Sequence, residues 1–221
     1  MFAPQCAVEI HDNSLYRRCI APKRSMLDCA PESTSDVSMP NEHIGELRKY
    51  VAELARESGE ARSVPLKRII ELIGKTFGVQ WHEVAILGLT SDERSLRFLS
   101  PDGLRIIGQI PLSSVNALAA RTARDKRPEL INHFSVVPHA SVFEGVPISE
   151  TERGNPIQKI MSAPIAIGQK VIGVLQVSRK GKAMADAGAD FTIPQLRELQ
   201  TIADALAPCI LLWNKKPEPT A

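Results

Sequence analysis

The order of elements along the chain predicts an α+β fold with one antiparallel sheet. The residue pattern indicates two helices, then strands around a short helix and a long loop, and finally a hairpin and a closing helix. The hairpin, PIAIGQKVIGVLQV at 164–177, is the most informative stretch because both of its apolar runs lack regular polar positions. A strand with one face in water would alternate apolar and polar residues. We therefore expect this hairpin to lie inside the sheet, with other elements covering it on both sides.

The residues between the two apolar runs, Gly168 and Gln169, fit a type II′ turn, which prefers glycine at its first position. Such a turn predicts these cross-strand pairs: Ile167 with Lys170, Ala166 with Val171, and Ile165 with Ile172. Alternation along each strand then assigns the side chains to two faces. One face is expected to carry Ile165, Ile167, Lys170, Ile172, Val174 and Gln176, and the other Ala166, Val171, Gly173, Leu175 and Val177. Both faces are mostly apolar.

The chain before the predicted sheet divides into a leader and a helix. Residues 1–40 mix proline, serine and charged residues without a sustained period, which predicts a disordered leader. From Asn41, a candidate N-cap, apolar residues recur at spacings of three and four, and Gly59 is a candidate stop. This pattern predicts an amphipathic helix within 41–60. Its apolar stripe consists of Ile44, Leu47, Val51 and Leu54.

A second helix is expected to open at Pro65, because proline is favoured at the first helical position, and to end near Gly78. Five elements are predicted to follow it: strands at 83–90, 95–100 and 105–112, a helix at 115–127, and a strand at 129–132. PDG at 101–103 is the expected turn between the second and third strands. Ser113 or Ser114 is the expected N-cap of the short helix.

The long segment 133–156 holds three prolines, and a compact domain rarely keeps such a loop without a use for it. Beyond the hairpin, Thr192 is the expected N-cap of the closing helix, which Pro208 is expected to interrupt. Residues 215–221 are expected to form a flexible tail. The closing helix also carries an apolar stripe: Leu196, Leu199, Ala203, Leu206, Ile210 and Trp213.

Composition narrows the class of protein. The 221 residues are 43% hydrophobic, enough for a full core, and 27 basic residues against 25 acidic ones give a formal charge of only +2. This balance favours no polyanionic partner, so nucleic acid is not expected. No apolar run approaches the roughly 18 residues that a membrane span needs, and the N-terminus lacks the pattern of an export signal. We expect a soluble cytoplasmic protein.

The cysteines do not form a metal-binding pattern. Cys6, Cys19, Cys29 and Cys209 are too widely spaced for a CxxC zinc site, and three of them fall in the predicted leader. The sequence requires no metal and no cofactor. Cys209 is expected to be a core thiol.

Three segments together resemble the GAF domain family, over about residues 65–213. IPLSSVNALAARTARDKRPELINH is similar to the family's unit of strand, helix and short strand, which ends near an asparagine. SAPIAIGQKVIGVLQVSRKGK is similar to its paired strands, and FTIPQLRELQTIADALAPCI to its closing helix. The segments occur in the family's order at suitable distances. A GAF domain is therefore expected within 61–214.

The resemblance implies a sheet of five or six antiparallel strands with the terminal helices on one face. A short helix and the long loop would lie on the other face and enclose a ligand pocket. Family members that attach a bilin, or that reduce free methionine sulfoxide, use cysteines near the pocket, whereas this domain holds only Cys209. The motif of cyclic-nucleotide-binding members is absent, because Ser178-Arg179 and Gln195-Leu196 stand where it would lie.

Several residues are candidates for ligand binding. His133 and His139 are possible ligands of haem or iron, although a single histidine is more often a hydrogen-bonding loop residue. Polar residues of the loop region would orient a small polar ligand, and aromatic residues would wall a pocket. The full candidate set is Phe98, Asn132, His133, Phe134, His139, Phe143, Arg153, Gln158 and Ser162.

These observations leave three functions open. The first is a non-catalytic sensor in signal transduction, which binds a small molecule and signals through the terminal helices of a homodimer to a separate partner protein. The stripe Ile44, Leu47, Val51 and Leu54 would form the dimer interface, although such stripes also cover a chain's own sheet. The second is a ligandless module for dimerisation or protein interaction. The third is a haem- or nucleotide-binding sensor. An enzyme is not expected, because no nucleophile, base or metal cluster converges on the predicted pocket.

Overall fold

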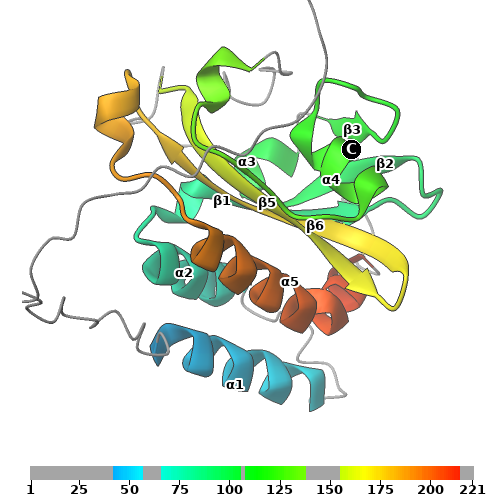
Figure 1. Ribbon diagram of the computed structural model, residues 1–221. Helices are drawn as coiled ribbons and strands as arrows, with labels where there is room; N and C mark the ends of the chain where they lie inside the picture. The colour runs from blue at the N-terminus through cyan, green and yellow to red at the C-terminus, as the bar shows by residue number, and fades with distance from the viewer. Residues whose placement is uncertain (1–41, 57–65, 106–107, 138–154, 215–221) are drawn as a thin grey trace, which may run out of the picture. The chain divides into compact units, whose positions relative to one another are not determined.

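The computed structural model describes residues 42–56, 66–105, 108–137 and 155–214 (Figure 1), with side chains described from 45 to 53 in the first of these ranges. Its helices and strands are α1 Glu42–Arg56, α2 Leu66–Phe77, β1 Val84–Leu89, β2 Ser95–Ser100, α3 Asp102–Arg105, β3 Gln109–Pro111, α4 Leu118–Asp125, β4 Glu129–Ile131, β5 Ile157–Ile167, β6 Lys170–Lys180 and α5 Ile193–Asn214. Short 3₁₀ helices lie at η1 Trp81–Glu83, η2 Phe134–Val136 and η5 Met184–Ala187.

Six strands in the described part of the chain form one sheet in the order β3-β2-β1-β6-β5-β4, and every neighbouring pair is antiparallel. Helices α2 and α5 lie along one face of this sheet, and α1 packs against both of them on the outer side (Figure 1). Helices α3 and α4 lie on the opposite face. The α+β architecture predicted for the chain is therefore confirmed.

The β5–β6 hairpin is covered on both faces, as the sequence predicts. On the α5 side, Ile165, Leu175 and Val177 belong to a buried cluster that includes Leu206 and Ile210 of α5. On the α4 side, Val171 and Val174 are buried in a second cluster, together with Leu87, Leu96 and Ala120. The hairpin is apolar on both sides because neither side faces water.

The predicted register of the hairpin is right at the turn and wrong beyond it. Ile167 pairs with Lys170 and Ala166 with Val171, and Gly168 has the positive φ of 59° that the turn requires. The register then shifts, so that Ile165 pairs with Gly173 instead of Ile172. A bulge of this kind places consecutive residues on one face. Ile172 therefore lies with Leu175 on the α5 side, whereas Val174 lies on the α4 side.

Two further boundaries differ from the prediction. Residues 102–105, expected as a turn and the start of a strand, form α3, and β3 is limited to Gln109–Pro111 at the edge of the sheet. Helix α4 begins at Leu118 after Ala117, not after Ser113 or Ser114. The chain first makes a turn, in which the Ser114 backbone N–H donates to the Pro111 carbonyl at 3.0 Å, and this turn delays the helix.

The start of α5 is as predicted. Thr192 Oγ1 accepts a hydrogen bond from the Gln195 N–H at 3.4 Å, and the Gln195 side chain accepts one from the Thr192 N–H at 3.0 Å. This reciprocal pair is a capping box. The helix continues through Pro208 to Asn214, so the proline does not end it.

Helix α1 covers its own domain at the positions whose side chains are described. Leu47 is 0% exposed and Val51 3% exposed, and both belong to the cluster formed with α2 and α5. These two side chains are therefore not exposed for the dimer interface assigned to them, because the chain's own helices already bury them. Ile44 and Leu54, the other residues of that stripe, lie outside the described side chains.

A substitution at Gly173 tests how closely β6 approaches β1. A Cβ atom at this position would lie 2.5 Å from the Leu87 carbonyl oxygen on β1, a backbone atom that cannot move away cheaply. Gly173→Ala is expected to lower the free energy of unfolding by about 1–3 kcal/mol in urea denaturation.

Gly45→Ala is the matched control, because the added methyl group on α1 meets nothing within 4 Å. This substitution should stabilise by about 0.5–1 kcal/mol through helix propensity. Equal effects at the two positions would contradict the close approach of β1 and β6.

Candidate functional site

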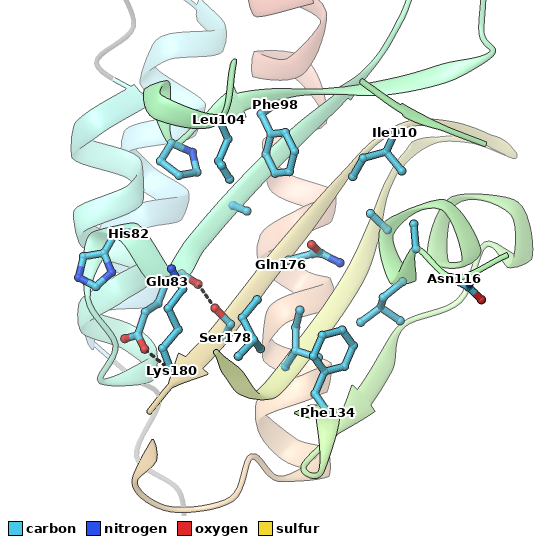
Figure 2. Close-up of a pocket in the computed structure, with 17 residues that line it drawn as sticks. His82, Glu83, Phe98, Leu104, Ile110, Asn116, Phe134, Gln176, Ser178 and Lys180 are labelled. Carbon is cyan, nitrogen blue, oxygen red and sulfur yellow. Dashed lines mark hydrogen bonds between the residues drawn. The ribbon is translucent and has the colours of Figure 1, made fainter. Parts of the chain in front are cut away.

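A cavity of about 100 Å³ lies on the sheet face opposite α5, between β1, β2 and β6 below and α3 and α4 above (Figure 2). Ala85 on β1, which pairs with Gln176 on β6, lines the cavity, and its short side chain occupies little of this space. For comparison, an engineered apolar cavity of about 150 Å³ holds a benzene molecule. The cavity therefore has room for a small organic molecule.

The walls of the cavity are mostly apolar and well buried. Phe98, Leu104 and Ile110, from β2, α3 and β3, form one side, and each is at most 7% exposed. The other side is formed by the first turn of α4 together with Phe134, which is 5% exposed (Figure 2). Apolar walls of this type bind a ligand by removing its carbon surface from water.

The floor of the cavity is polar. Gln176 and Ser178 are two positions apart on β6, so both point to the α4 side of the sheet. Ser178 Oγ donates a hydrogen bond to the Glu83 carbonyl at 3.1 Å. Gln176 Nε2 donates to Ser162 Oγ at 3.1 Å. These two side chains are the polar groups that a molecule in the cavity would meet on the central strand.

A buried pair of hydroxyl groups, from β5 and α4, holds Gln176 in place. Ser162 Oγ on β5 lies 2.8 Å from Thr122 Oγ1 on α4, and both residues are 0% exposed. Buried polar groups that bond one another hold a fixed geometry, because breaking the bond would leave each group unsatisfied. The Gln176 amide is therefore connected through Ser162 to the middle of α4.

Charged residues line one end of the cavity. The Glu83 carboxylate accepts hydrogen bonds from the backbone N–H groups of Gln80, at 2.8 Å, and Lys180, at 2.7 Å. Glu83, Lys180 and His82 all contribute to the lining (Figure 2). These contacts fix η1 against the end of β6 and keep that end of the cavity in place.

The structure places the predicted ligand residues in two groups. Phe98 and Phe134 line the cavity. Asn132, His133, Gln158 and Ser162 are absent from its lining. Of the remaining candidates, His139, Phe143 and Arg153 lie outside the described residues.

Asn132 and Gln158 instead hold the segment that leads into α5. The Asn132 amide bonds both backbone groups of Phe191, each at 2.9 Å, and Gln158 Nε2 donates to the Gly181 carbonyl at 2.9 Å. Exposed His133 contacts Met184 of the same segment, with Nδ1 2.9 Å from the sulfur atom. The Asn132 and Gln158 amides are therefore occupied by backbone groups of the chain itself, and His133 by a methionine side chain.

Two basic side chains complete the attachment of this segment. Lys159, only 4% exposed, forms an ion pair with Asp190 at 2.7 Å and donates to the Gly188 carbonyl at 2.5 Å. The Arg179 guanidinium lies 4.7 Å from the centre of the Phe191 ring. Together with Asn132 and Gln158, these contacts fix residues 181–191 to the strands; we call this segment the α5 leader.

Gln176, Ser178 and Glu83 were missed as candidate site residues. The available signal was the pair of polar residues at the end of an otherwise apolar strand, in VIGVLQVSRK. Polar residues inside a strand that is covered on both faces need partners or a ligand.

Cys209 is a buried thiol on the α5 face of the sheet, remote from the cavity lining. Burial raises the pKa of this thiol to about 11. A thiol with a raised pKa is a poor nucleophile at neutral pH, because the thiolate is the reactive form. Cys6, Cys19 and Cys29 lie outside the described residues.

No group of three or more His, Cys, Asp or Glu side chains in 42–56, 66–105, 108–137 and 155–214 could hold a metal ion. Within the same ranges, no helix combines the length and the apolar character required to span a bilayer.

Comparison with known proteins identifies the family. The GAF domain model matches residues 63–210, which is most of the chain. The chain therefore belongs to the GAF domain family. No significant match was found among curated proteins.

Solved structures agree with this assignment at the level of the fold. The GAF domain of an Acinetobacter phosphoenolpyruvate-protein phosphotransferase is 18% identical, with a TM-score of 0.53 over 78% of this chain and 95% of that one. The A. aeolicus nlh2 GAF domain, in an inactive state, is 14% identical, with a TM-score of 0.52 over 76% and 93%. The free methionine-R-sulfoxide reductase of Neisseria meningitidis, in complex with its substrate, is 13% identical, with a TM-score of 0.53 over 79% and 89%.

The ion pair of the α5 leader predicts a pH dependence of stability. The hydrogen bond from Lys159 and the charge of that lysine hold the pKa of Asp190 below its usual value of 3.8. A carboxyl group with a lowered pKa stabilises the folded state above its unfolded pKa, and this contribution is lost as the pH falls through the folded value. Asp190→Asn should lower the urea midpoint at pH 7, and the difference from wild type should shrink as the pH falls below about 4.

The control for this measurement is Glu53→Gln, at an exposed position on α1. It should show no comparable change with pH. A wild-type and Asp190→Asn difference that stays constant from pH 7 to about pH 2 would contradict the role of the ion pair.

The burial of Cys209 predicts that its thiol reacts slowly with thiol reagents in the folded protein. In a variant whose Cys6, Cys19 and Cys29 are replaced by serine, Cys209 should react with a thiol reagent at pH 8 only as fast as the protein opens. Addition of denaturant should make the reaction immediate. Rapid modification of the native variant would show that the thiol is accessible and ionised, contrary to its burial.

Proposed function

We propose that this chain is a non-catalytic sensory GAF domain that binds a small molecule between the sheet and α4 and signals through its terminal helices. The observation that supports this proposal is the cavity of about 100 Å³, with apolar walls and a polar floor on β6. Small-molecule sites commonly combine these two features, because the walls supply binding energy and a few polar groups supply specificity.

A route from the cavity to α5 supports a regulatory role. Strand β6 lines the cavity through Gln176 and Ser178, and one residue further along Arg179 stacks on Phe191 of the α5 leader. Helix α5 packs in turn on β5, β6 and α1. Consider two states that differ in the position of β6 and therefore of α5. A ligand that binds one state more tightly would raise the population of that state, to an extent set by its difference in affinity for the two states.

Homodimerisation and a separate partner protein are part of the proposal. Exposed Leu211 and Leu212 near the end of α5 give this helix an apolar outer surface that a second chain would cover. Leu47 and Val51 do not provide such a surface, because they are buried within one chain.

The first alternative is a ligandless interaction module. The small volume of the cavity favours this alternative, because side-chain movements of modest size would fill it. A haem- or nucleotide-binding sensor is the second alternative. Sites for drug-sized ligands usually measure about 300–1,000 Å³, so the cavity bounded by the described residues would have to expand to hold either group.

The absence of catalysis is part of the proposal as well. One structural relative is named as a free methionine-R-sulfoxide reductase. Thiol chemistry of that kind needs a reactive cysteine at the site. Cys209 is buried on the other face of the sheet with a raised pKa, and this position supports a binding function.

A thermal-shift screen tests the proposal directly. Nucleotides, amino acids, tetrapyrroles and small organic molecules are added in excess, and a ligand of the folded state raises the melting temperature. Ala85→Leu fills the space beneath α4 with a larger side chain and should abolish the shift caused by any ligand of the cavity.

Ala52→Leu, at an exposed position on α1, is the control and should retain the shift. A ligand whose shift survives in Ala85→Leu binds elsewhere. If no compound shifts the melting temperature of a dimeric wild-type protein, the ligandless module becomes the better account.

A further inference from the structure

The floor of the cavity presents hydrogen-bond acceptors. The Gln176 side chain leaves β6 toward the α4 side of the cavity (Figure 2), and its Nε2 is bound to Ser162. Its carbonyl oxygen, Oε1, has no hydrogen-bond donor among the described residues. This atom is therefore available to accept a hydrogen bond from a molecule in the cavity.

Ser178 adds a second acceptor. Its hydroxyl proton is directed to the Glu83 carbonyl at 3.1 Å, so the lone pairs of Oγ are what remains for a ligand. Gln176 and Ser178 lie side by side on one face of β6. A ligand group that faces this strand must donate hydrogen bonds.

The opposite wall presents donors. The first turn of α4, at Leu118 and Ala119, lines the cavity, and the N-cap residue Ala117 has no side-chain oxygen to accept from it. The first N–H groups of a helix have no acceptor within the helix. A ligand group that faces α4 must accept hydrogen bonds.

The two walls are held in register by the buried hydroxyl pair. Thr122 lies one turn after Leu118 on α4, and its bond to Ser162 at 2.8 Å connects α4 to the residue that orients Gln176. The acceptor floor and the donor wall thus form one site. A ligand group that bonds both the floor and the wall must therefore contain a hydrogen-bond donor and a hydrogen-bond acceptor.

We propose that the cavity selects a small neutral primary carboxamide and that Gln176 is the residue that determines this choice. The inference rests on the proposed small-molecule function and narrows it to a chemical class. The amide carbonyl would accept from α4, the amide NH₂ would donate to Gln176 Oε1 and Ser178 Oγ, and the carbon chain would lie against Phe98 and Ile110. A carboxylate or an ester of the same size supplies no proton to the floor, so its oxygen atoms would face the half-buried Gln176 amide without a hydrogen bond, and acceptors left without a donor are costly.

The test compares propanamide, propanoate and methyl acetate, which have the same number of non-hydrogen atoms. Their dissociation constants are measured by two-dimensional amide NMR titration of the full chain. Propanamide should bind about tenfold more tightly than either of the others, the difference expected for hydrogen bonds that are made or lost in a buried site. The chemical-shift changes should include Gln176 and the first turn of α4.

Gln176→Met keeps the length of the side chain and removes the amide. This variant keeps only the Ser178 acceptor, so most of the preference for propanamide over methyl acetate should be lost, and methyl acetate should bind at least as tightly as it binds the wild type. Thr122→Val keeps the shape of the buried pair and removes its hydroxyl bond, so the preference should fall partway while the melting temperature shows that the fold is kept. This second variant reports on the mechanism even if Gln176→Met fails to fold.

The outcomes separate the two proposals. If none of the three probes binds, the carboxamide inference is overturned, whereas the small-molecule function is decided by the thermal-shift screen. If all three bind wild type with similar affinity, or if Gln176→Met keeps the preference for propanamide, the cavity remains a binding site and the carboxamide inference alone is wrong.

Discussion

Burial of the β5–β6 hairpin on both faces is the constraint on which the rest of the structure depends. On the α5 side, Leu175 and Val177 are 0% exposed, and each fully buried side chain of this size contributes about 1.5–3 kcal/mol to folding. On the α4 side, Val174 is packed equally well, but the next residues on that face are Gln176 and Ser178. The cover over β6 therefore changes from tight packing to a cavity within a few residues. The residues of the strand itself determine where the cavity lies.

The same strand connects the cavity to the closing helix. Gln176 and Ser178 face the cavity, whereas Arg179 contacts Phe191 and donates to the Phe77 carbonyl at 3.1 Å. Lys159 is paired with Asp190, so the α5 leader is attached to β5 as well. Lys159 is buried, whereas the Asp190 side chain is 60% exposed. Polar contacts made by a buried charge favour the one arrangement in which that charge is paired. The contacts of Arg179 and Lys159 with the α5 leader therefore hold the start of α5 at a fixed position relative to β6, which forms the floor of the cavity.

Much of the fold could be predicted from the sequence because its signals are local. The pattern around Gly168-Gln169 predicts both the turn and the covered hairpin, and Thr192 with Gln195 marks the start of α5. The bulge beside Ile165 could not be predicted, since it depends on how β5, β6 and β1 pack together rather than on any residue type. One shifted residue then moved Ile172 to the opposite face from Val174.

The candidate site is harder to predict, because the type of a polar residue does not tell whether it faces a ligand or bonds another part of the chain. Asn132 and Gln158 were reasonable ligand residues, yet both bond the backbone of the α5 leader, whose path across the sheet is set by tertiary packing. Phe98 lines the cavity from the covered face of β2, whereas Phe134 reaches it from η2, outside the sheet. Gln176 was assigned to a face of the hairpin, but its role depends on Ser162 and Thr122, which are far from it in sequence.

Xenon binding tests the central claim most directly, because xenon enters existing apolar cavities without requiring knowledge of the natural ligand. Crystals of the protein under xenon pressure should show a xenon atom between β1 and β6 on one side and α3 and α4 on the other, in contact with Phe98 and Ala85. Xenon bound elsewhere, with side chains filling the space above Gln176, would contradict the account and show that this face of the sheet is fully packed.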